Sequence, residues 1–180
     1  MLQRKEIRLD LCDPFINDNP RRWSFMEQES IQTYYEHDHD RLDEGFERYR
    51  RLKRENFAEA KQSFKTFFFG LKRHILWEEE ILFPMFEDKT GMRDAGPTAV
   101  MRMEHRQIES LLDALHGKVR AGNPESDIEE EAILRILKPH NDKEESILYP
   151  HIDAHLTADE KRLVFAGMEG VPENRYNTCC

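Results

Sequence analysis

Two stretches of this 180-residue chain carry the same histidine, glutamate and proline residues 66 positions apart. The repeated residues are of types that bind ions or interrupt helices: His39 with His105, His74 with His140, Glu78 with Glu144, and Pro84 with Pro150. A chain with such a repeat is expected to build one structural unit twice. The sequence therefore predicts two copies of a single unit, related by a pseudo-twofold axis.

The residues between these positions predict helices. Apolar side chains recur three, four and seven positions apart, without the alternating β-branched runs typical of strands. Helix start signals occur at Ser24, Asn56 and Ser126, each followed three residues later by Glu, and at Pro97, which suits a first helical turn. The sequence thus predicts an all-α antiparallel up-and-down four-helix bundle at residues 24–160, an irregular arm at 1–23 and a tail at 161–180.

Helix geometry brings the repeated histidines to one level. His39 lies about 16 residues before the first hairpin turn and His74 about 19 after it, which at about 1.5 Å per residue gives them similar heights. His105 and His140 each lie about 17 residues from the second turn. All four imidazoles are therefore expected to converge in one layer between the helices.

Carboxylates accompany three of these histidines at a spacing of four, which brings both side chains to one helix face. Four imidazoles with two or three carboxylates favour a binuclear transition-metal centre, and carboxylate bridging favours iron or manganese over zinc. Glu109 could be a metal ligand or a solvated side chain. On the last helix, Glu145 is the alternative to Glu144 as the carboxylate ligand. The predicted ligands are His39, His74, Glu78, His105, Glu109, His140 and Glu144.

The composition of the chain disfavours some classes of binding partner. With 36 acidic and 27 basic residues the net charge is −9, which disfavours a nucleic-acid surface. No stretch approaches the ~18 apolar residues of a membrane span, and residues 1–10 lack the apolar part of a secretory signal. The three cysteines, Cys12, Cys179 and Cys180, do not indicate a disulfide framework. These features predict a soluble cytoplasmic protein with neither nucleic acid nor membrane as partner.

Several motifs together resemble a known family. His39 stands in an Asp-His-x-x-Leu context, and Glu104-His105-x-x-Ile108 has a similar one. His74-x-x-x-Glu78-Glu79 and His140-x-x-x-Glu144-Glu145 each run into Leu-[Phe/Tyr]-Pro. Over about residues 30–155 the chain resembles the hemerythrin family, in its bacterial members with a His/His/Glu cation-binding domain.

That resemblance implies a non-haem, oxo- or hydroxo-bridged centre of two Fe ions. Glu78 and Glu144 would bridge the ions, the histidines would be terminal ligands, and one position would stay open for a small molecule. Oxygen-carrying members have His four residues after the third-helix His, where this chain has Glu109. An additional anionic ligand there favours the ferric state.

The main functional hypothesis is a protein that binds or senses dioxygen or another small diatomic or peroxide ligand, with any signal passing to an unknown protein partner. One alternative is a di-iron redox enzyme of the oxidase or peroxidase type. Another is iron storage or delivery for the repair of iron–sulfur centres. Tyr35 is expected either to hydrogen-bond a bound ligand or a carboxylate, or to pack in the core. Apolar walls beside the metals are expected at Phe67, Leu71, Leu112 and Ile136.

Overall fold

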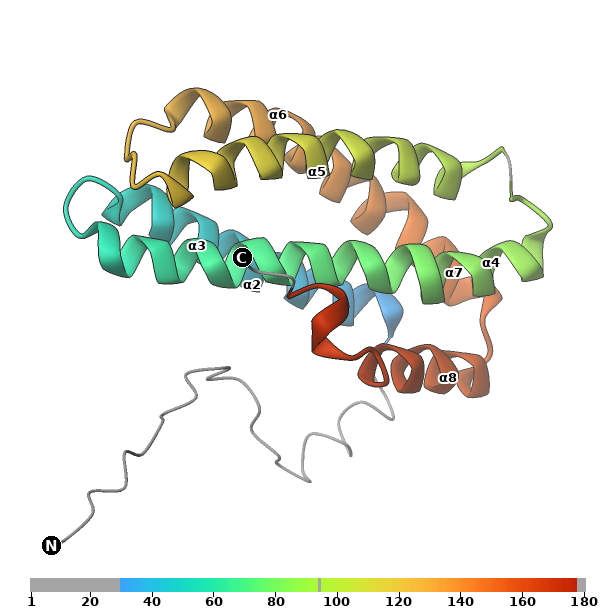
Figure 1. The fold of residues 1–180 in the computed structure, drawn as a ribbon. Coiled ribbons are helices and arrows are strands. Elements are labelled where there is room, and N and C mark those ends of the chain that lie inside the picture. Colours follow the sequence, from blue (N-terminus) through green and yellow to red (C-terminus); the bar gives the residue numbers. More distant parts are fainter. Residues whose placement is uncertain (1–29, 94, 178–180) are drawn as a thin grey trace, which may run out of the picture.

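The computed structural model describes residues 30–93 and 95–177, in which all regular structure is helical (Figure 1). The prediction of an all-α antiparallel bundle is confirmed. The α-helices are α2 (Ile31–Leu52), α3 (Phe57–Trp77), α4 (Phe83–Thr90), α5 (Pro97–Arg120), α6 (Asp127–Lys143), α7 (Tyr149–His155) and α8 (Ala158–Glu169). Two π-helical turns, η1 (Glu78–Leu82) and η2 (Glu144–Leu148), join α3 to α4 and α6 to α7, and a short 3₁₀ turn, η3 (Glu173–Arg175), follows α8.

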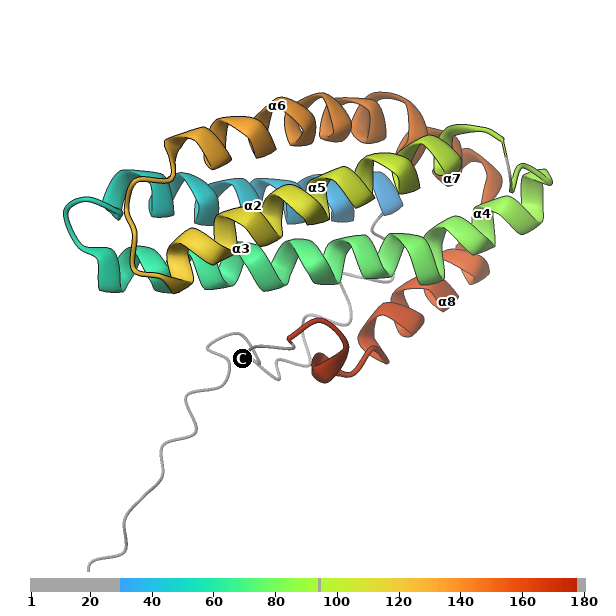
Figure 2. The same ribbon diagram turned by 45° about the horizontal axis from the view of Figure 1, so that its top comes forward.

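The sequence repeat is also a structural repeat. Helices α2 and α5 begin at residues 31 and 97, the π-helical turns at 78 and 144, and helices α4 and α7 at 83 and 149, always with the same offset. Helix α2 packs against α3, and α5 against α6. The α2–α3 and α5–α6 turns lie at one end of the bundle and α4 and α7 at the other, as both ribbon views show (Figures 1 and 2). Two helical hairpins of one design therefore form the bundle.

The π-helical turns occur where each hairpin approaches its proline. The amide of Phe83 donates to the carbonyl of Glu78, five residues back, and the amide of Tyr149 does the same to Glu144. Pro84 and Pro150 have no amide hydrogen, so they cannot continue this pattern. Side chains from other helices reach the carbonyls five residues before them: Arg102 donates to Glu79 O and Gln32 to Glu145 O, each at 3.5 Å. Such turns are often found at functional sites.

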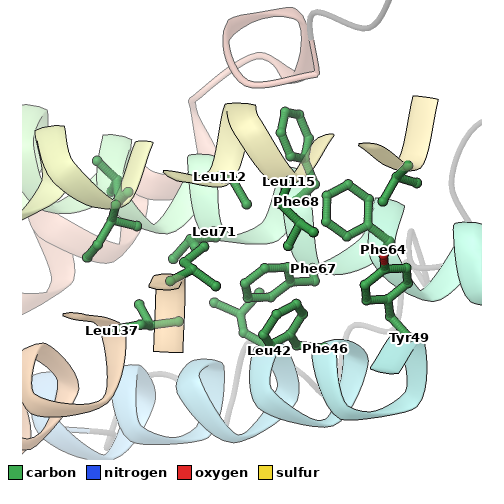
Figure 3. Close-up of a cluster of buried hydrophobic side chains, with 14 of the residues drawn as sticks. Leu42, Phe46, Tyr49, Phe64, Phe67, Phe68, Leu71, Leu112, Leu115 and Leu137 are labelled. Atoms are coloured by element: carbon green, nitrogen blue, oxygen red, sulfur yellow. The ribbon is translucent and has the colours of Figure 1, made fainter. Parts of the chain in front are cut away.

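Two apolar clusters fill the bundle. The first lies toward the hairpin turns and is rich in phenylalanine; Figure 3 shows its aromatic and leucine side chains meeting from several helices. Phe46 and Phe67 stack there with ring centroids 4.4 Å apart. Gly70 allows α2 to approach closely, since a Cβ there would come within 2.4 Å of a Leu42 methyl. The second cluster lies around α4, α7 and α8 and includes Phe83, Phe86 and Tyr149.

Helix α2 begins at Ile31, later than the sequence suggested, and residues 24–29 lie outside the described part of the chain. Ser30 has extended backbone angles and caps α2 by accepting the amide of Thr33, so a continuous helix from Ser24 is wrong. Asp153 of α7 also accepts the amides of Ile31 and Gln32, which ties the start of α2 to the other hairpin. The predicted arm at residues 1–23 and all three cysteines lie outside the described residues.

The start at Asn56 is confirmed, with Asn56 accepting the amide of Glu59. Helix α5 begins at Pro97 as expected. Ser126 precedes α6 but does not cap it; its hydroxyl donates to Glu130 instead.

The expected tail from residue 161 is wrong for residues 161–169, which belong to α8. A capping box of Thr157 and Glu160 starts this helix. Its apolar face packs into the second cluster, and the carbonyl of Met168 accepts the indole N–H of Trp77 at 3.0 Å. The burial of α8 depends on contacts with residues far earlier in the chain, which sequence periodicity does not show.

A buried polar network joins the hairpins at their turns. Lys53 is buried in this network and its ammonium donates to Asp127, at 2.9 Å, and to Glu130. Ser126 donates to Glu130 at 2.6 Å and lies 2.7 Å from the hydroxyl of Tyr49. Each charge of this network therefore has a partner of opposite sign.

Replacing Lys53 with Met is expected to destabilise the protein by about 3 kcal/mol, because the buried charge of Glu130 would lose its ammonium partner and keep only Arg50, at 3.3 Å, as a cation. Urea unfolding measures this. The double variant Lys53→Met/Glu130→Leu should recover most of the loss, and exposed Arg54→Met, which removes a neighbouring pair, should leave stability nearly unchanged. Equal losses in Lys53→Met and Arg54→Met would contradict a buried network.

Candidate metal centre

Six buried side chains meet in the layer between the two apolar clusters. They form two groups whose ligand atoms lie within 4.8 Å of one another: Glu78, His105, His140 and Glu144 in the first, and His39, His74 and Glu144 in the second. In the first group Glu78 Oε2 lies 3.1 Å from His105 Nε2, and Glu144 Oε1 lies 3.1 Å from His140 Nε2. In the second, the two Nε2 atoms of His39 and His74 are 3.1 Å apart. The two groups share Glu144.

Each imidazole turns its other ring nitrogen, Nδ1, outward to a carboxylate. An ionised carboxylate only accepts hydrogen bonds, so each Nδ1 carries a proton and each Nε2 faces the layer. The acceptors are Asp38 for His74 (3.0 Å), Glu79 for His105 (2.9 Å), Glu104 for His140 (2.9 Å) and Glu145 for His39 (2.7 Å).

These four outer carboxylates follow the repeat. Asp38 and Glu104 occupy equivalent positions and each binds a histidine of its own hairpin, whereas Glu79 and Glu145 each bind a histidine of the other hairpin. Three of them also pair with a cation: Asp38 with Arg41, Glu79 with Arg106, and Glu104 with Lys143. The hydrogen bonds therefore orient the imidazoles and also join the two hairpins.

The charges of the layer shift the pKa values of its members. Burial lowers the pKa of His39, but the hydrogen bond and charge of Glu144, with Glu145 and Glu78, outweigh it and raise the pKa to about 9. For His105 burial is again outweighed, here by Glu78 and Glu79, and the pKa rises to about 10. Burial raises the pKa of Glu144, yet the adjoining imidazoles of His140 and His39 hold it well below its ordinary value.

The donor set fits a pair of cations. Among the described residues, the buried atoms Glu78 Oε2, Glu144 Oε1 and His105 Nε2 have no hydrogen-bond partner. Leaving buried polar atoms unpaired is costly, and native proteins seldom do it without an ion, a water or a function. Imidazole and carboxylate donors suit first-row transition metals. The imidazole and carboxylate side chains of this layer are therefore suitable ligands for such ions.

A small pocket reaches the layer from the side of α2, α3 and α6. Of the four residues expected as apolar walls, Leu71 lines it; Phe67 and Leu112 lie in the first apolar cluster, and Ile136 packs against that cluster. The pocket is lined by His39, Leu42, Asp43, Leu71, His74, Ile75, Leu137, His140 and Asn141.

The structure brings together six of the seven predicted ligands. Glu109 is half-buried on α5, and within the described ranges it belongs to neither donor group. Its ligation stays a prediction. Glu144 lies in both groups, while the side chain of Glu145 is 37% exposed and binds His39 from outside. The hydroxyl of Tyr35 donates to the sulfur of Met168, at 3.8 Å, and not to a carboxylate of the layer.

Two kinds of functional residue were missed. The hydroxyl of Tyr149 lies 2.8 Å from Glu78 Oε1 and 3.1 Å from Glu144 Oε2, a contact that the distance of five residues from Glu144 did not suggest. The outer carboxylates were present in the motifs as neighbours of ligands, since each stands next to a ligand in the chain. Their repetition at the same offset was the signal that could have identified them.

A four-helix bundle with two adjoining groups of imidazole and carboxylate donors in its core defines a class of cation-binding proteins. Residues 30–152 match the hemerythrin HHE cation-binding domain. The chain belongs to the hemerythrin HHE family.

Curated relatives match over a short segment. The iron–sulfur cluster repair protein YtfE of Edwardsiella ictaluri is 47% identical over 45 residues, and that of Salmonella schwarzengrund 40% over 45 residues. In both cases the match covers 25% of this chain and 20% of the relative. No solved structure matches. Among the described helices, none is both long and apolar enough to cross a membrane.

The metal-free protein is expected to lose stability as pH rises from about 6.5 to 10. A histidine whose pKa is raised by folding stabilises the folded state fully below its unfolded pKa of about 6.5, and this contribution disappears as pH passes the folded value. For His39, with a folded pKa of about 9, the loss is about 3 kcal/mol. Urea unfolding in the presence of a chelator measures this.

The metal-loaded protein is the control, because an ion replaces the protons on the Nε2 atoms and should remove the fall. At acid pH three carboxylates matter: the pKa values of Asp38, Glu79 and Glu144 are lowered in the folded protein. They stabilise the folded state at pH values above their pKa in the unfolded chain, and this contribution is lost as the pH falls. A flat profile between pH 6.5 and 10 would show that the histidines do not hold protons in the metal-free layer.

Proposed function

We propose that this chain is a non-haem di-iron protein that binds or senses dioxygen or another small diatomic or peroxide ligand. The observation that carries the proposal is the pair of buried donor groups that share Glu144. A carboxylate with both oxygens directed to different groups of imidazoles is suited to bridge two ions. His39, His74, Glu78, His105, His140 and Glu144 would hold the ions, with Glu109 as an additional ligand.

The surroundings of the donors support a small ligand. Leucine and isoleucine side chains make up much of the pocket wall beside His39, His74 and His140. An apolar wall admits a small neutral molecule and excludes larger polar ones. Two iron ions held there would supply the redox chemistry, whereas the chain would orient the imidazoles and keep bulk water away. Sensing would require an unknown protein partner that detects the change.

A redox enzyme is the second candidate, and it depends on Glu109. This residue lies one turn after His105 on α5. If it supplied an anionic oxygen ligand, the ferric state would be favoured and reduction of oxygen or peroxide would replace reversible binding.

Delivery of iron for the repair of iron–sulfur centres is the third candidate. It is favoured by the relatives, which are named iron–sulfur cluster repair proteins. Because the match covers only 20% of those relatives, the test must be direct. A protein whose [4Fe–4S] cluster has lost one iron should regain activity with the iron-loaded chain and a reductant, and not with a metal-free chain.

Anaerobic loading with Fe²⁺ is expected to bind two ions per chain and to raise the Tm. Ions that bind only the folded state stabilise it by about 2.7 kcal/mol at a hundredfold excess over Kd, which corresponds to about 5–10 °C here. Calorimetry and metal analysis measure the two effects.

Glu78→Gln should reduce the number of bound ions below two. Glu80→Gln is the matched control: it makes the same change in the same π-helical turn, but Glu80 is exposed and pairs with Arg175. If metal-free and loaded protein melted together, or if the two variants behaved alike, the ions would not bind in the core.

The optical spectrum of the reduced, iron-loaded protein should distinguish the first two candidates. Exposure to oxygen should produce a ligand-to-metal charge-transfer band, and purging should remove it if binding is reversible. Immediate passage to a stable oxidised spectrum would favour the redox enzyme.

Replacing Glu109 with His tests the additional ligand. The oxygen-bound form should live longer in this variant if Glu109 ligates iron, because a neutral donor stabilises the ferric state less. Asp113→His, one turn further along α5 at an exposed position, is the control. An unchanged lifetime in Glu109→His would remove Glu109 from the ligand set.

A further inference from the structure

The repeat is broken at one position that faces the donor layer. Phe83 and Tyr149 are equivalent residues, both fully buried, at the end of η1 and η2 respectively. The ring of Phe83 lies parallel to that of His105, with centroids 6.0 Å apart. The hydroxyl of Tyr149 has no counterpart on that side, and it lies within hydrogen-bond distance of both Glu78 and Glu144.

The carboxylates of Glu78 and Glu144 each have one oxygen that accepts a hydrogen bond from the Tyr149 hydroxyl and one that does not. Tyr149 donates to Glu78 Oε1 and Glu144 Oε2, sharing its one proton between them. The remaining oxygens, Glu78 Oε2 and Glu144 Oε1, have no hydrogen-bond partner within the described chain, nor does His105 Nε2. These unpaired atoms all belong to the group of Glu78, His105, His140 and Glu144.

The other half of the layer is hydrogen-bonded to itself. His39 Nε2 and His74 Nε2 are 3.1 Å apart, and the Tyr149 oxygen lies 3.4 Å from His74 Nε2. An ion entering between His39 and His74 would have to break their mutual hydrogen bond and compete with the hydroxyl for the carboxylate oxygens. An ion beside His105 would meet Glu78 Oε2, Glu144 Oε1 and His105 Nε2, none of which has a hydrogen-bond partner in the described chain, although the two oxygens lie 3.1 Å from the Nε2 atoms of His105 and His140.

The hydroxyl cannot leave easily. The ring of Tyr149 packs against those of Tyr35 and His39, with centroids 4.9 and 5.9 Å away. Dense packing of this kind leaves a buried side chain few other rotamers. Tyr149 therefore stays beside the carboxylates whether or not an ion is bound.

We propose that Tyr149 makes the two ion positions unequal. The first ion binds at Glu78, His105, His140 and Glu144, and the Tyr149 hydroxyl lowers the affinity of the second position, at His39 and His74. Tyr149 is thus a positioning residue that sets the order of loading. This inference rests on the proposed binding of two ions.

The test is an anaerobic titration with Fe²⁺, repeated with Co²⁺ as a spectroscopic probe. The unaltered protein should bind two ions in two resolved steps. Tyr149→Phe, which gives η2 the residue found at the equivalent place in η1, should narrow the ratio of the two binding constants about tenfold by strengthening the second step. Tyr35→Phe is the matched control, because it also removes a buried tyrosine hydroxyl, but one that donates to Met168 and not to a carboxylate.

A second measurement needs no variant. With one equivalent of Zn²⁺, the NMR signals of the His105 and His140 rings should shift, while those of His39 and His74 should keep their metal-free positions. Equal shifts in all four rings, an unchanged ratio in Tyr149→Phe, or a weakening of both steps in that variant would overturn the proposal. Binding of fewer than two ions by the unaltered protein would overturn the proposed function as well, whereas two equal steps would overturn this inference alone.

Discussion

The fold depends on the burial of a polar layer in the middle of an apolar core. Four imidazoles and two carboxylates lie between one apolar cluster at the hairpin turns and another around α4, α7 and α8. Ionisable groups are buried at a large cost unless each is paired. Four carboxylates outside the layer bind the Nδ1 atoms and offset part of this cost, whereas three atoms inside it have no hydrogen-bond partner in the described chain. The same hydrogen bonds that orient the ligands thus stabilise the contact between the hairpins.

The π-helical turns follow from the same requirement. Glu78 and Glu79 are neighbours in the chain, yet one points into the layer and the other reaches His105 on α5. Glu144 and Glu145 divide their tasks in the same way. The wider turn begins at each inward carboxylate and ends before the helix that carries the proline. Each proline removes one backbone donor there, and the carbonyls left without that donor are bonded by Arg102 and Gln32.

Much of this arrangement could be predicted from the sequence because it is periodic. Helix spacing and the repeat placed His39, His74, His105 and His140 at one level, since height along a helix depends only on residue number. The hydroxyl of Tyr149 could not be found in this way, because the wider turn changes which residues share a face. Helix α8 was missed for a different reason: its burial depends on Trp77 and the second apolar cluster, contacts between residues far apart in the chain. The start of α2 is also set at a distance, by Asp153.

The difference between Phe83 and Tyr149 makes the two halves of the repeat unequal. The pocket is lined by His39 and His74 of one donor group and by His140 of the other, whereas His105 is fully buried and takes no part in its lining. The outer carboxylate of His39 is Glu145, which is more exposed than the other three and, in the described part of the chain, forms no pair with Lys or Arg. The two halves of the layer therefore differ at two places: the Tyr149 hydroxyl has no counterpart at Phe83, and the carboxylate that binds His39 is the most exposed of the four. If two ions bind as proposed, these differences would give them unequal surroundings in a bundle whose two hairpins otherwise share one design.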